Sequence, residues 1–139
     1  MFIRRIDHAT ILPTKHCFDD ALDYIEAEII KDSLSHFSLF LVHGICLIPS
    51  GKDEGKRFAH AWVEELGKVY ESGIYENQLV YVTFDKKDFY GRLRVEKFTR
   101  YSVLQALKLN LENGHYGPWE KEYRALCAEN MERENEITT

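Results

Sequence analysis

The sequence has no long apolar run, no basic cluster and no closely spaced pair of cysteines, and each absence narrows the range of functions. No stretch approaches about 18 consecutive apolar residues, and the N-terminal residues 1–8 contain no apolar run long enough for a signal peptide. We therefore expect a protein that has no membrane partner and resides in the cytoplasm.

The charge balance argues against nucleic-acid binding. The chain has 18 Lys and Arg residues against 23 Asp and Glu residues, a formal net charge of −5, and no block of basic residues interrupts this acidic balance. Because affinity for nucleic acid depends largely on the neutralisation of phosphates, no nucleic-acid partner is expected.

The three cysteines are Cys17, Cys46 and Cys127, which are odd in number and widely separated, without a CxxC pair. This spacing argues against both a disulfide framework and a structural zinc site. Cys46 and Cys127 lie within apolar patterns and are interpreted as packing residues. At least one thiol must remain outside any internal disulfide.

The chain contains enough hydrophobic residues to form one core. Of its 139 residues, 45% are hydrophobic and 13% are aromatic, so we expect a single domain over residues 1–139. Apolar residues at helical spacing predict a helix over 17–31, with Cys17 at its start. A second helix is predicted from Ser102 to Asn113 and a third from Pro118 to about Met131, followed by a polar tail, 132–139, that we expect to fray.

Between the first and second helices the sequence is rich in β-prone segments separated by turn formers. The predicted fold class is therefore α+β: an antiparallel sheet of four to five strands, an N-terminal helix that carries Cys17, and two C-terminal helices. The predicted strand segments are 2–12, 37–48, 57–64, 69–71 and 79–84, with a further short strand within 89–95 after a turn over 85–88.

His60 is at the centre of one of these strands, Arg57 to Glu64. A period of two places Phe58, His60 and Trp62 on one face, so the imidazole is flanked by two large aromatic rings. Such a histidine is either a hydrogen-bonded core residue or a base directed at a nucleophile from elsewhere in the chain.

If His60 is a base, the sequence also offers a nucleophile and an acid to act with it. A thiol at a helix N-terminus has a lowered pKa, an imidazole stores its proton, and a carboxylate fixes the imidazole tautomer. The predicted order is Cys17 as nucleophile, His60 as base and Glu71 as orienting acid. A two-residue turn at Leu66-Gly67 would pair Trp62 with Glu71, and the Glu71 side chain would then share the face of His60.

The segment His60-Ala61-Trp62-Val63-Glu64 resembles the histidine strand of the transglutaminase-like branch of the papain-like cysteine hydrolases. The segment Leu41-Val42-His43-Gly44 of the preceding strand and the return strand Lys68-Val69-Tyr70-Glu71 extend the likeness. The resemblance implies a helix-opening cysteine packed against an antiparallel sheet that carries a histidine and an acidic partner. It further implies a thiol-dependent hydrolase or acyltransferase, such as a cysteine peptidase, an amidase or a transglutaminase-like acyltransferase, acting on a peptide or protein substrate without a cofactor.

Other interpretations of the same residues are structural or concern different ligands. Cys17 can be a small buried apolar residue, His60 a core histidine and Glu71 a solvated strand residue. The same scaffold can also serve as a non-catalytic domain that binds a peptide or partner protein. A metal site would require His16, Cys17, His43 and His60 to converge, but no pair has zinc-ligand spacing. Trp119, Tyr116 and Tyr123 are interpreted as aromatics that dock a helix on the sheet.

Overall fold

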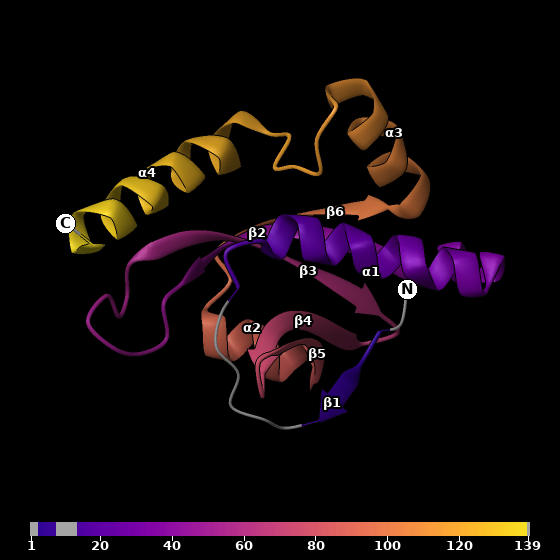
Figure 1. Cartoon of the computed structure of the whole chain (residues 1–139), viewed down its shortest axis with the longest axis horizontal. Helices are drawn as coiled ribbons and strands as arrows, with labels where there is room; N and C mark the ends of the chain where they lie inside the picture. The colour runs from indigo at the N-terminus through magenta and orange to yellow at the C-terminus, as the bar shows by residue number, and fades with distance from the viewer. Residues whose placement is uncertain (1–2, 8–13, 139) are drawn as a thin grey trace.

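A computed structural model describes residues 3–7 and 14–138 of the chain and shows an α+β protein built on one six-stranded sheet. The spatial order of the strands is β1-β5-β4-β3-β2-β6 (Figure 1). The strands are β1 (Arg5–Asp7), β2 (Leu39–Leu47), β3 (Arg57–Glu65), β4 (Lys68–Tyr75), β5 (Gln78–Asp85) and β6 (Lys97–Ser102). The helices are α1 (Cys17–Lys31), the 3-10 helix η1 (Ser33–Phe37), α2 (Lys86–Leu93), α3 (Val103–Asn113) and α4 (Lys121–Thr138).

The predicted fold class is confirmed in outline, but the predicted sheet is wrong in two respects. It has six strands rather than four or five, and it is mixed, because β1 pairs with β5 in parallel while the other pairs are antiparallel. Of the predicted 2–12 strand, Arg5–Asp7 forms β1, and residues 2 and 8–13 lie outside the described residues.

The structure of the segment after β5 also differs from the prediction. Residues 85–95 were expected to form a turn and a short strand, yet the structure places α2 over Lys86–Leu93 and a sixth strand, β6, directly after it. The helical signal is the spacing of Phe89 and Leu93, four residues apart and both buried. Asp85 at the N-cap position supports it, since Asp favours that position.

The other helices follow their sequence signals. α1 begins at Cys17 and ends at Lys31, as predicted. Ser102 and Gln105 form a reciprocal capping box at the start of α3, and Gly114 ends it in the left-handed conformation. α4 begins at Lys121, later than the predicted Pro118, and it continues to Thr138 through most of the tail that was expected to fray. No helix in the described part of the chain is both long and apolar enough to span a membrane.

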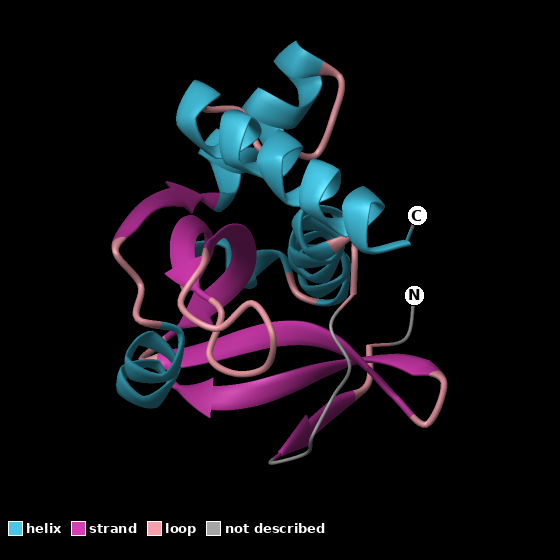
Figure 2. Cartoon of the chain, turned by 90° about the vertical axis from the view of Figure 1, so that its left-hand side faces the viewer, coloured by secondary structure: helices cyan, strands magenta, loops and turns pink. Residues whose placement is uncertain are grey.

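Helices cover both faces of the sheet and bury two apolar clusters. α1, α3 and α4 lie on one face, and α2 lies apart from them on the other (Figure 2). Along β3, Ala59, Ala61 and Val63 face the three helices, whereas Trp62 packs in the cluster beneath α2. The period of two predicted for this strand is therefore confirmed.

Gly44 allows the buried Trp62 ring to approach strand β2 closely. A Cβ atom at position 44 would lie 2.5 Å from Trp62 Cη2 and 3.1 Å from the backbone oxygen of Lys97. Both the ring and the backbone are fixed by the core, so neither can move aside cheaply.

We expect Gly44→Ala to lower the free energy of unfolding by about 2 kcal/mol, because overpacking a dense core typically costs 1 to 3 kcal/mol. Denaturant unfolding followed by tryptophan fluorescence measures the change. Gly91→Ala is the matched control, since nothing lies within 4 Å of its Cβ position in α2. Equal stability of the Gly44→Ala variant and the unmodified chain would contradict the expected clash.

His43 is fully buried on the opposite face of β2. Rings of Phe18, Tyr101, Trp119 and Tyr123 surround it, and neither of its ring nitrogens has a hydrogen-bond partner in the described structure. Burial lowers the pKa of His43 to about 3. The aromatic residues near Trp119 thus pack a helix against the sheet, as the sequence indicated.

The pKa of His43 predicts a specific acid sensitivity. Below pH 6.5 the unfolded chain binds a proton at position 43 that the folded chain refuses until about pH 3, so stability is lost as the pH falls through this window. Between pH 7.5 and 5.0 the unmodified protein should lose about 2 kcal/mol more stability than His43→Leu. Denaturant titrations of both proteins at the two pH values measure this difference, and parallel pH curves would contradict it.

Candidate functional site

The site lies where strands β3 and β4 separate. Their hairpin turn is Leu66-Gly67, as predicted, with both residues in the left-handed region that a two-residue turn requires, and Glu65 pairs with Lys68. Pairing ends after Val63 and Tyr70, only three residue pairs from the turn. By contrast, β3 pairs with β2 over nine residues and β4 with β5 over eight.

This separation corrects the predicted register beyond the turn, in which Trp62 was expected to pair with Glu71. Instead, the free edge of β3 is used by a side chain of α4. The Asn130 amide accepts a hydrogen bond from the Ala59 backbone N–H at 3.2 Å and donates one to the Arg57 carbonyl at 3.2 Å. Asn130 thereby takes the place of a strand, since these backbone groups would otherwise lack partners.

The open edge explains how residues from opposite faces of the sheet meet. Cys17 is the first residue of α1, which packs on β3 from the face of the three helices, whereas His60 points toward α2. Where β3 and β4 are hydrogen-bonded to each other, the sheet would separate these side chains. Where the two strands separate, the start of α1 can reach the His60 imidazole.

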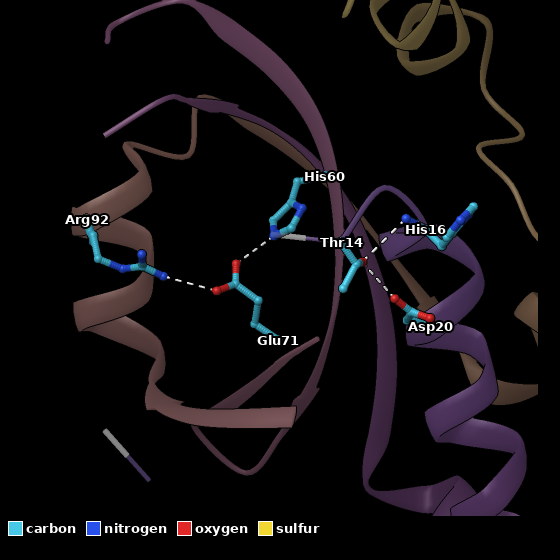
Figure 3. A network of polar contacts seen from close by, with 6 residues as sticks. All are labelled: Thr14, His16, Asp20, His60, Glu71 and Arg92. Carbon is cyan, nitrogen blue, oxygen red and sulfur yellow. Dashed lines mark hydrogen bonds and ion pairs between the residues drawn. The ribbon is translucent and has the colours of Figure 1, made fainter. Parts of the chain in front are cut away.

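His60 and Glu71 are in direct contact. His60 Nε2 and Glu71 Oε2 lie 2.7 Å apart, and both side chains are only 12% exposed (Figure 3). The imidazole lies among the rings of Phe58, Trp62 and Phe89. The carboxylate that the sequence proposed as the orienting group therefore contacts one nitrogen of the ring, although the strands are not paired at this level.

Cys17 acts electrostatically on the same ring. Burial lowers the pKa of His60, but the electrostatic influence of Cys17 and the hydrogen bond and charge of Glu71 together raise that pKa to about 10. Because Nε2 is engaged by Glu71, Nδ1 is the nitrogen available to the sulfur. Cys17 is partly exposed, so a reagent or substrate can reach it.

Glu71 remains ionised despite its burial. Burial raises the pKa of its carboxyl group, but the hydrogen bond and charge of His60, followed by the charge and hydrogen bond of Arg92, lower it below its ordinary value. Arg92 Nη2 donates to Glu71 Oε1 at 3.3 Å. The structure thus brings together all three predicted site residues and adds Arg92, which sequence analysis missed because it read this segment as a strand.

The other two thiols differ from Cys17 in their surroundings. Cys46 is fully buried, and burial followed by the charges of Glu71 and Cys17 raises its pKa. Burial and the charge of Cys17 raise the pKa of Cys127 to about 11. Both are therefore protonated at neutral pH, which agrees with their interpretation as packing residues.

Metal binding has no support in the part of the chain that is described. Over residues 3–7 and 14–138, no group of three or more His, Cys, Asp or Glu side chains is placed to hold an ion. His43, one of the histidines considered for such a site, is enclosed by aromatic rings instead. The arrangement suits chemistry in which a thiol, an imidazole and a carboxylate share protons.

We expect the coupling between Cys17 and His60 to be visible in a titration. Since Cys17 raises the pKa of His60, Cys17→Ser should shift the titration of the His60 ring to lower pH by at least about one unit. Heteronuclear NMR of the imidazole between pH 5 and 10.5 measures this shift. Cys127→Ser is the control and should leave the His60 titration in place, and unchanged curves for both variants would contradict the contact.

Comparison with known proteins identifies no relative. No family model matches the sequence, and neither the curated proteins nor the solved structures contain a significant match. The likeness to the transglutaminase-like branch therefore rests on the strand that carries His60 and on the positions of Cys17 and Glu71, and it remains a hypothesis.

Proposed function

We propose that the protein is a thiol-dependent hydrolase or acyltransferase that acts on an amide or thioester through Cys17, His60 and Glu71. The observation that supports this most directly is a single imidazole that contacts a buried carboxylate and whose pKa is raised further by a partly exposed thiol. A histidine needed only for packing requires neither partner, as His43 on the neighbouring strand illustrates.

The proposed reaction follows from these contacts. The Cys17 sulfur attacks the substrate carbonyl carbon, and the thiol proton is held on His60. His60 then delivers that proton to the departing amine or thiol, which leaves an acyl group on Cys17 as a thioester. Water or a second nucleophile then attacks the thioester carbonyl and loses a proton to His60. The bond from carbon to sulfur breaks, and His60 passes that proton to the sulfur, which restores the free Cys17 thiol.

Two features of the site suit this sequence of steps. Glu71 carries a negative charge beside Nε2 and stabilises the imidazolium that forms during proton storage. α1 begins at Cys17, and the first N–H groups of a helix have no carbonyl partner within it. The Cys17 backbone N–H is therefore a candidate donor to the oxygen that becomes negative in the transition state.

Selective alkylation tests the proposal. Iodoacetamide at pH 7 should modify Cys17 at least about tenfold faster than Cys127 or Cys46, because His60 can take up the Cys17 proton whereas burial raises the pKa of the other two thiols. His60→Ala should remove most of this advantage. Peptide mass spectrometry at timed intervals gives the three rates separately.

His115→Gln is the matched control, since it removes a histidine from the loop between α3 and α4 and should leave the Cys17 rate unchanged. A second test uses an activated thioester of a short carboxylic acid, which should leave an acyl group on Cys17 and none on the Cys17→Ser variant. Slow labelling of all three thiols at equal rates, without acyl transfer, would reject the enzyme and favour a domain that binds a peptide or partner protein beside His60.

A further inference from the structure

We propose that Arg92 is a positioning residue of this site, which fixes the Glu71 carboxylate so that one oxygen faces His60. This inference rests on the proposed function and adds to it a fourth residue, supplied by the helix on the far face of the sheet. Within residues 3–7 and 14–138, Arg92 contacts Glu71 and two aromatic rings but neither the sulfur nor the imidazole, so its effect is exerted through Glu71.

The two oxygens of Glu71 have different partners. Oε2 lies 2.7 Å from His60 Nε2, and Oε1 accepts a hydrogen bond from Arg92 Nη2 at 3.3 Å. Figure 3 shows the carboxylate between the imidazole and the guanidinium, with His60 on the side of α1 and Arg92 on α2. A carboxylate held at both oxygens cannot rotate about its last bond without losing one of these contacts.

Arg92 is itself held in place. Its guanidinium carbon lies 4.8 Å from the centroid of the Phe84 ring and 5.8 Å from that of Phe89, distances at which a cation is attracted to an aromatic face. Phe89 is fully buried and stacks on the His60 ring at 6.3 Å with an interplanar angle of 16°. α2 therefore supplies both a ring that packs on the imidazole and the charge that holds its acid.

The electrostatic need for Arg92 comes from the burial of Glu71. The groups that act on this carboxylate are His60 from β3 and Arg92 from α2, and its own charge acts on the Cys46 thiol of β2. Cys17 from α1 acts on it through the imidazole. Arg92 is thus the permanent positive charge among these groups, since the charge of His60 comes and goes when it stores a proton.

A double-mutant cycle tests the inference. The variants are Arg92→Met, Glu71→Gln and the two together, and the measurement is the rate of Cys17 alkylation by iodoacetamide from pH 4.5 to 8. Arg92→Met should move the acid limb of the rate profile to higher pH by about one unit, because Glu71 then takes up a proton more readily. In the Glu71→Gln background, Arg92→Met should change nothing further, since there is no carboxylate left to hold.

Two further variants separate positioning from folding. Arg92→Lys retains the positive charge and should restore most of the shift, whereas Lys87→Met removes one charge from the same helix and should leave the profile unchanged. An equal shift of the acid limb from Arg92→Met in both backgrounds, or no shift in the otherwise unmodified chain, overturns the inference. If Glu71→Gln has no effect on Cys17, the proposed function fails; if Glu71→Gln slows Cys17 and Arg92→Met does not, only the inference about Arg92 fails.

Discussion

The candidate site depends on the point where β3 stops pairing with β4. Three residue pairs beyond the turn the strands separate, and the free edge of β3 is satisfied partly by the Asn130 amide. A continuous ladder would have kept α1 and α2 on opposite sides of a closed sheet. The interruption lets the first residue of α1 reach a histidine that points to the other face, so a defect in backbone pairing makes the constellation of side chains possible.

Burial without a partner and burial with partners have opposite effects on two neighbouring histidines. His43 and His60 are on paired strands, with His43 opposite Ala61 and Gly44 opposite His60. Burial alone lowers the pKa of His43 to about 3, whereas Cys17 and Glu71 overcome burial and raise that of His60 to about 10. His43 is therefore a neutral packing residue, and His60 is the histidine of this pair that retains a proton near neutral pH.

A second buried carboxylate, that of Glu64, holds the aromatic surroundings of His60 in place. Glu64, the last residue of the His60-Ala61-Trp62-Val63-Glu64 segment, accepts hydrogen bonds from Trp62 Nε1 at 3.0 Å, from Arg100 at 2.8 Å and from the Tyr90 hydroxyl. These contacts join β3 to β6 and α2, and they fix the Trp62 ring next to His60. The buried charge is tolerated because it is paired and hydrogen-bonded. Through Tyr90 this cluster also joins β3 to α2, the helix that carries Arg92.

Local patterns in the sequence determined much of this protein: the alternation that assigns the faces of β3, the apolar spacing of α1 with Cys17 at its start, the two-residue turn at Leu66-Gly67, and the capped ends of α3. Such features depend on residues a few positions apart, so a single sequence is sufficient to read them. Only the tertiary structure decided that β1 joins the sheet in parallel and which histidine acquires partners. Contacts between Arg92 and Glu71, or between Asn130 and Ala59, join residues 21 and 71 positions apart. The packing of the whole chain determines these contacts, and no local periodicity in the sequence predicts them.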